Sequence, residues 1–139
     1  MDSLEWEILI PAEPVAKGRP RADRRHGRMY TPKATRLAEK ELRCHLEGAW
    51  KGSPISKEVP LSVSVTFYIK RPKSVSVKKR PHPTTKPDVD NYLKLVLDSL
   101  NGIVIEDDSA IVDVHAHKRY STVPSVHLHL KVLSTAPQD

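Results

Sequence analysis

The pattern of hydrophobic and polar positions along the chain predicts four main strands. In residues 59–69 an apolar side chain occupies every second position, which is the clearest strand pattern in the sequence. Residues 4–10 alternate more loosely and end at Pro11, as a first strand would. Residues 111–120 and 125–133 also alternate and are joined by a short link. We expect these last two strands to pair as a terminal antiparallel hairpin.

Two further segments have apolar residues at spacings of three and four, which are typical of helices. The first helix is expected to begin with Thr31 as its N-cap and Pro32 in its first turn, and to end at Gly52. Its apolar face consists of Ala38, Leu42, Leu46 and Ala49. The second helix is expected to run from about Asp88 to Leu100 and to stop at Asn101-Gly102. Its apolar face consists of Val89, Leu93, Val96, Leu97 and Leu100.

The order of these elements is β, α, β, α, β, β, which predicts an α+β fold. Helices would cover a largely antiparallel or mixed sheet. A chain of 139 residues has too little material for two independent cores, so residues 1–139 are expected to form a single small domain.

Charge and cysteine content narrow the class of protein. The net charge of +6 suggests an anionic partner such as nucleic acid. The single cysteine, Cys44, excludes an intramolecular disulfide and a thiolate zinc cluster, and we expect it to pack on the first helix. The first residues lack the basic start of a secretory signal, and no apolar run approaches the roughly 18 residues of a membrane span. We therefore expect a cytoplasmic protein without a membrane partner.

Two basic segments stand out. Residues 14–28 contain six Lys/Arg and one aspartate, and residues 70–86 contain seven Lys/Arg and no acid. Their prolines and glycines predict irregular loops, the second of them long and mobile. Loop lysines also serve solubility, but this concentration favours DNA phosphate binding. The predicted DNA-binding residues are Lys17, Arg19, Arg21, Arg24, Arg25, Lys70, Arg71, Lys78, Lys79, Arg80 and Lys118.

Four aspartates flank the second helix in two tight groups, Asp88 with Asp90 and Asp107 with Asp108. The groups can meet if residues 103–105 run back along that helix. Carboxylates gathered in this way repel one another unless a hard divalent cation neutralises them, and oxygen ligands suit Mg²⁺ or Mn²⁺. The sequence therefore predicts a metal site of the kind that hydrolyses phosphodiesters.

Lys94 follows Asp90 by one helical turn, so it is expected to contact the scissile phosphate or the attacking water. Asp98 is two turns from Asp90 and is expected to be a supporting or merely exposed residue. Each acid also has an ordinary structural interpretation. Asp88 would be an N-cap, Asp90 with Lys94 a surface ion pair, and Asp107-Asp108 a solvated turn.

Four histidines form a second group of possible ligands: His115 and His117 on one predicted strand, and His127 and His129 on the next. In the predicted hairpin, the register could bring all four together. A zinc site is thus an alternative to an ordinary solvated sheet face, although the spacing matches no short-range zinc signature.

The chain resembles the RusA family of Holliday junction resolvases. The resemblance rests on KPDVDNYLKLVLDSLNG at 86–102 and IEDDSAIVDVHAHKRY at 105–120, supported by KGRPR at 17–21 and YTPKAT at 30–35. It implies a homodimeric, magnesium-dependent enzyme that cuts four-way junctions by paired symmetric nicks.

By position, the resemblance implies that Asp88, Asp90, Lys94 and Asp108 are catalytic, with Asp107 beside them as a weaker metal ligand. The chain departs from the family pattern at one point. Family members can carry aromatic residues in the loop before the first acids, and residues 70–86 contain none. Two alternatives stay open: a non-catalytic junction- or RNA-binding module, and a metal-dependent nuclease that prefers other branched DNA.

Overall fold

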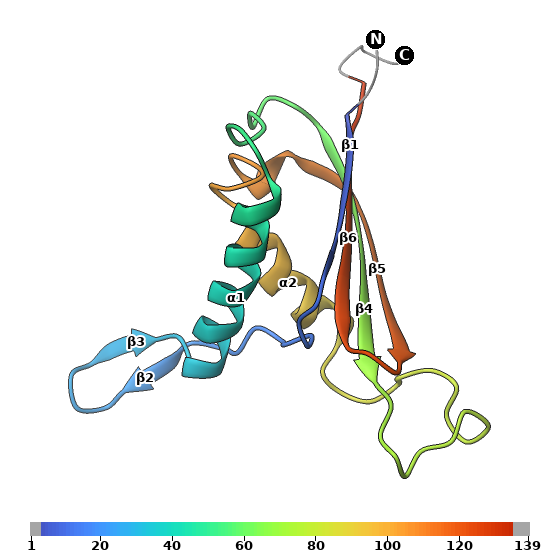
Figure 1. Cartoon of the computed structure of the whole chain (residues 1–139). Helices are drawn as coiled ribbons and strands as arrows, with labels where there is room; N and C mark the ends of the chain where they lie inside the picture. Colours follow the sequence, from blue (N-terminus) through green and yellow to red (C-terminus); the bar gives the residue numbers. More distant parts are fainter. Residues whose placement is uncertain (1–3, 135–139) are drawn as a thin grey trace.

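A four-stranded mixed sheet, covered on one face by two helices, forms the body of the protein (Figure 1). The computed structural model describes residues 4–134. The sheet strands are β1 (Glu5–Ile10), β4 (Leu61–Lys70), β5 (Ile111–Ser121) and β6 (Ser125–Val132), in the order β1-β6-β4-β5. The helices are α1 (Lys33–Ala49), α2 (Val89–Leu100) and the short 3₁₀ helix η1 (Asp108–Ala110). A separate ribbon consists of β2 (Arg21–Asp23) and β3 (Arg28–Tyr30). The predicted α+β fold is confirmed.

Strand β4 lies inside the sheet, as its strict alternation predicts. Leu61, Val63, Val65 and Phe67 face the helices and are at most 1% exposed. Burial of each such side chain contributes about 1.5–3 kcal/mol. The serine and threonine residues between them lie on the opposite face, which no helix covers (Figure 1). The sheet thus has one apolar face on the core and one polar face.

The predicted terminal hairpin is wrong. Strands β5 and β6 do not pair with each other, because β4 lies between them, antiparallel to β6 and parallel to β5. Residues 122–124 cross the end of β4, and the link from Ser121 to Ser125 is long enough to span two strand spacings of about 4.8 Å each. Strand β4, which has the most regular apolar alternation, takes an interior position in which both of its edges are paired.

This topology separates the four histidines. Ser64 of β4 lies between His115 and His129, and Thr66 lies between His117 and His127. The two members of each row are therefore about 10 Å apart. Within residues 4–134, no three His, Cys, Asp or Glu side chains are grouped so that they could hold one metal ion. The zinc alternative at these histidines is therefore wrong, and they belong to the polar face of the sheet.

Helix α1 packs against α2, and its Leu42 and Leu46 are buried in the core. Its N-cap is Pro32 rather than Thr31, and it ends at Ala49 rather than at Gly52. The prediction that Cys44 is a packing residue is wrong, because this side chain is exposed. No helix within residues 4–134 is long and apolar enough to cross a membrane.

Both basic segments contain structure or contacts that the sequence did not predict. Residues 14–28 contain β2 and the start of β3, so they are not irregular throughout. In residues 70–86, Arg71 stacks on Tyr120 and donates hydrogen bonds to the carbonyl oxygens of Ser76, Arg80 and Pro81. These contacts link the two ends of the long loop to each other and to β5.

Candidate active site

The start of α2 presents two carboxylates without a protein partner. Asp88 is the N-cap residue, with extended backbone angles of φ −68° and ψ 150°, but its side chain makes no capping hydrogen bond. Asp88, Asp90 and Lys94 are all exposed, and none of their side chains forms a hydrogen bond or ion pair in the described part of the chain. The cap and the Asp90–Lys94 ion pair of the structural interpretation are absent from residues 4–134. These groups are thus available to a ligand.

Contacts from three other elements fix this end of α2. Lys118 Nζ, on β5, donates hydrogen bonds to the carbonyl oxygens of Thr85 (2.7 Å) and Pro87 (2.8 Å), just before Asp88. Tyr92 stacks on Phe67 of β4, with ring centroids 5.2 Å apart. The Lys17 amide donates to the Asn91 carbonyl at 3.0 Å. The two carboxylates therefore stand on a firmly held helix start.

The second half of α2 is also tied to distant parts of the chain. The ammonium group of Lys17 forms an ion pair with Asp98, and both side chains are partly buried. Arg43 Nη1 of α1 donates to the carbonyl oxygens of Ser99 (3.3 Å) and Asn101 (2.9 Å). A cation at these free carbonyls is favourable, because they lie at the negative end of the helix dipole.

Asp107 and Asp108 lie together where the chain enters η1. The Ser109 hydroxyl donates to Asp107 Oδ2 at 2.7 Å, and this bond is the main reason that the pKa of Asp107 is below its usual value. Burial raises the pKa of Asp108, and the carboxylates of Asp107 and then Asp98 raise it further. The two neighbours therefore differ, since one carboxylate is already satisfied and the other is crowded by negative charge.

A polar stripe on α2 connects the two groups of acids. Asp90, Lys94 and Asp98 follow one another at intervals of four residues, so they lie along one side of the helix. Asp108 is near Asp98, at the far end of this stripe, whereas Asp88 lies ten residues, or about 15 Å, before Asp98. Asp88 and Asp90 thus lie at one end of α2 and Asp107 and Asp108 near the other, so the predicted meeting of the two groups is wrong within residues 4–134.

The residues at the Asp108 end suit a hard cation. Asn101 Oδ1 is buried and has no hydrogen-bond partner within the described residues, although the Asn101 side chain also contacts Asp108. A buried carbonyl oxygen without a partner is unfavourable, and carboxylate and amide oxygens are ligands that Mg²⁺ and Ca²⁺ accept. The donor set is thus compatible with a magnesium ion.

The predicted DNA-binding residues fall into two groups. Arg19, Arg21, Arg24 and Arg25 are exposed at the β2–β3 ribbon, and Lys70, Lys78 and Lys79 are exposed on the long loop. The charged groups of the remaining four are engaged with the protein: Lys17 with Asp98, Lys118 with loop carbonyls, Arg71 with its own loop, and Arg80 with Tyr120. Lys17 and Lys118 therefore hold the basic segments in place.

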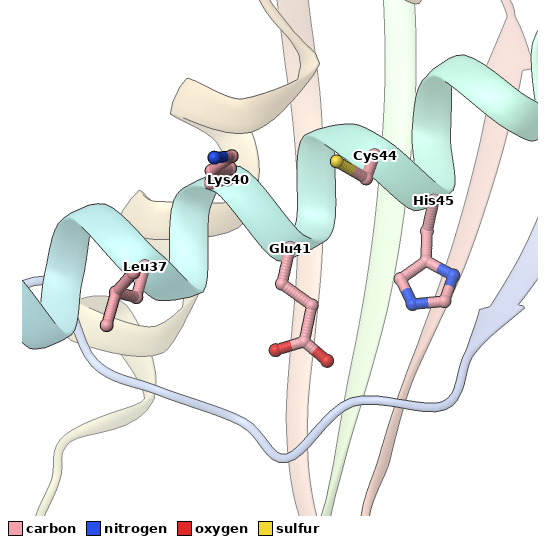
Figure 2. A pocket seen from close by; sticks show the side chains of 5 residues that line it. All are labelled: Leu37, Lys40, Glu41, Cys44 and His45. Atoms are coloured by element: carbon pink, nitrogen blue, oxygen red, sulfur yellow. The ribbon is translucent and has the colours of Figure 1, made fainter.

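One surface hollow lies on the other helix. It has a volume of about 490 Å³ and lies on α1, where Leu37, Glu41 and His45 project from one side and Lys40 and Cys44 from another (Figure 2). It contains a single carboxylate and none of the predicted site residues. The acidic helix α2 is the better candidate for the active site.

The sequence did not indicate the parts played by Asn101, Arg43 and Ser109. Asn101 was predicted only as a helix stop, Arg43 lies in no motif, and Ser109 lies in the segment 105–120 without an assigned role. For Asp98, the sequence contains one indication of its place: it follows Lys94 by four residues and Asp90 by eight, which puts all three on one side of a helix. Its ion pair with Lys17 joins positions 81 residues apart, which no local pattern can predict.

Comparison with known proteins identifies the family. The family model of the endodeoxyribonuclease RusA matches residues 11–131. The chain belongs to the RusA family. It is also 34% identical, over 143 aligned positions, to the uncharacterized protein YqaN of Bacillus subtilis (strain 168), covering 96% of this chain and 99% of that protein. Membership of the RusA family indicates a nuclease that acts on DNA, and the resemblance found in the sequence motifs is confirmed.

Proposed function

We propose that the chain is a magnesium-dependent endonuclease that resolves four-way DNA junctions as a homodimer, by paired symmetric nicks. The observation that supports this most directly is that both basic segments are held in place next to the acidic helix. Lys17 ties residues 14–28 to α2, and Lys118 of β5 holds the backbone at Thr85 and Pro87, where residues 70–86 lead into α2. DNA bound by the two segments would therefore lie against the acids of α2.

The side chains on and after α2 would have two roles, metal binding and phosphate binding. Asp108, with Asp107 and Asn101 as further oxygen donors beside it, would hold a metal ion near the end of α2, and Asp88 and Asp90 would supply carboxylates at the other end of that helix. Such an ion, when bound, activates water and stabilises the negative charge that develops on the phosphate and on the leaving oxygen. Lys94 has no partner in the described chain and projects beside Asp90, so it can orient and neutralise a bound phosphate.

The homodimer follows from the substrate. One chain offers one set of acids, whereas the resolution of a four-way junction requires two cuts in strands related by symmetry. A twofold dimer would supply two equivalent sets of acids on one face.

Cleavage of branched DNA is the decisive experiment. With Mg²⁺, the purified protein is expected to cut a synthetic four-way junction far faster than a linear duplex of the same sequence. Chelation should stop cleavage, and added Mg²⁺ or Mn²⁺ should restore it. On a supercoiled plasmid with an extruded cruciform, paired nicking should produce linear rather than nicked circular DNA.

Other results would change this assignment. Faster cutting of flaps or nicked duplexes than of junctions would show a nuclease with another preference. If no branched DNA is cut at any metal concentration, the enzymatic proposal fails.

Lys118 offers a test of how the acids are positioned. Lys118→Met keeps the aliphatic stem but removes the hydrogen bonds to Thr85 and Pro87. We expect the cleavage rate at saturating DNA to fall by about tenfold, because misplacing groups that support a metal site typically costs 10- to 100-fold. Junction affinity should change little, because this ammonium group is already engaged with carbonyl oxygens.

Lys78→Met is the matched control. Lys78 is exposed on the same loop, and its side chain has no partner in the described chain. Its loss should weaken binding and reduce the salt dependence of affinity by about 0.9 in log–log slope, without changing the rate at saturation. A lower affinity with an unchanged rate in Lys118→Met would contradict the positioning role.

A further inference from the structure

The β2–β3 ribbon is a basic arm that extends from the body of the protein. We use the name arm for residues 19–30. It projects on the side of α1 away from the sheet (Figure 1), and every residue in it except Asp23 is exposed. It carries five arginines and one aspartate. The side chains of this ribbon do not pack into the hydrophobic core. Their positive charge is therefore available to an anionic partner.

The tip of the arm is a well-defined turn. The Asp23 carboxylate accepts hydrogen bonds from the Arg25 amide (2.9 Å) and from His26 Nδ1 (2.8 Å). The Gly27 amide donates to the Asp23 carbonyl at 2.8 Å, and Gly27 has φ +64°, which favours glycine. The Asp23 carboxylate thus stabilises the turn, and a protonated His26 ring would balance its charge. The arginines are left unopposed.

The root of the arm is fixed next to the acidic helix. Lys17 is held by Asn91 and Asp98 of α2, and the next amide, of Gly18, donates to Thr35 Oγ1 of α1 at 2.9 Å. A Cβ atom at Gly18 would lie only 2.8 Å from Thr35 Oγ1, so the chain passes close to both helices before it enters the arm. The arm therefore leaves the body at a fixed place beside the candidate active site.

One face of the arm combines cations with an unused aromatic ring. Tyr30 pairs with Arg21 across the ribbon, and Arg28 lies two residues before it, so all three side chains share a face. The Tyr30 side chain is 48% exposed and has neither a ring contact nor a hydrogen bond in the described chain. Aromatic rings flanked by arginines are the arrangement by which proteins bind unpaired bases and their phosphates.

We propose that the arm engages the branch point of the DNA substrate, where Tyr30 stacks on a base and Arg21 and Arg28 neutralise the adjacent phosphates. The inference rests on the proposed function, in which the substrate is branched DNA. A branch point differs from a duplex in offering base faces that are not fully stacked. Tyr30 would supply the aromatic contact that residues 70–86, which contain no Phe, Trp or Tyr, lack.

The test compares Tyr30→Ala with Tyr30→Phe in the full-length chain, without divalent metal so that binding is measured alone. Removal of one stacking side chain typically costs about 1–3 kcal/mol, so Tyr30→Ala should lower junction affinity about 5- to 150-fold. Affinity for linear duplex should change much less, and Tyr30→Phe should bind like the wild type. A junction with 2-aminopurine at the branch point should change in fluorescence on binding of the wild type and Tyr30→Phe, but not of Tyr30→Ala.

Arg21→Gln separates charge from stacking. It should weaken binding to junction and duplex alike and lower the salt slope by about 0.9. If the wild type binds and cuts junctions while Tyr30→Ala matches it in affinity and fluorescence, this inference is overturned and the proposed function stands. If the wild type neither prefers nor cuts branched DNA, the proposed function itself fails.

Discussion

Asp90→Asn should bind four-way junctions as tightly as the wild type and cut them at least about 100-fold more slowly, as expected when a site loses a metal-binding carboxylate. Asparagine keeps the size of the side chain and removes its charge. Asp90 is exposed and has no partner within residues 4–134, so the fold should not depend on it. Gel-shift titration would measure binding, and single-turnover cleavage with Mg²⁺ would measure the chemical step.

Asp113→Asn is a suitable control for this variant. Asp113 lies on β5, on the face of the sheet opposite the helices, where it contacts Ser62 and His115. It loses the same charge and should cleave like the wild type. A non-catalytic binding module would instead give Asp88→Asn, Asp90→Asn and Asp108→Asn variants whose nucleic-acid activities are all intact.

Local patterns predicted most of the secondary structure. The alternation in β4 is strict because one face of the strand is fully buried. The pattern therefore shows which side chains face the core. Helix α2 was predicted within a residue because an apolar stripe, an aspartate at its start and Gly102 at its end, with φ +82°, agree with one another. Where several local signals coincide, the structure follows them.

Strand order was not predictable in the same way. The short link between β5 and β6 suggested a hairpin, but pairing partners depend on which strand is buried on both edges. β4 is more apolar on its inner face than β5, whose exposed Val114 lies at the edge of the sheet. Strand β4 therefore lies between β6 and β5. This order depends on how the whole core packs and not on the length of the link.

The acids of the candidate site stand out in the sequence, whereas their separation along α2 and the residues that hold them in place do not. Asp88, Asp90, Asp107 and Asp108 could be found because paired like charges are unusual in a basic protein. The anchors Lys17 and Lys118 were predicted to bind DNA, because in the sequence a lysine in a basic segment looks the same whatever it contacts. Only the fold brings their ammonium groups to carboxylate or carbonyl oxygens. The sequence thus shows which groups are present and leaves their partners open.

Asp108→Asn and Asp107→Asn should separate the two neighbouring aspartates. The Asp107 carboxylate is occupied by the Ser109 hydroxyl, whereas Asp108 is crowded by Asp107 and Asp98 and lies beside the unpaired Asn101 Oδ1. A divalent cation would relieve that crowding at Asp108. We expect Asp108→Asn to lose cleavage by about 100-fold or more, and Asp107→Asn to stay within about tenfold of the wild type.

Thermal unfolding with and without Mg²⁺ gives an independent measure of the same difference. A ligand that binds the folded state raises the Tm, so Mg²⁺ should stabilise the wild type and Asp107→Asn but not Asp108→Asn. The pKa of Asp108 is raised in the folded protein, so ionisation of Asp108 costs stability as the pH rises from the usual value of an aspartate through its folded pKa. Without metal, Asp108→Asn should therefore be at least as stable as the wild type at neutral pH. Equal loss of cleavage in both variants, with equal response to Mg²⁺, would show that the two carboxylates act as one unit and would remove the distinction drawn from Ser109.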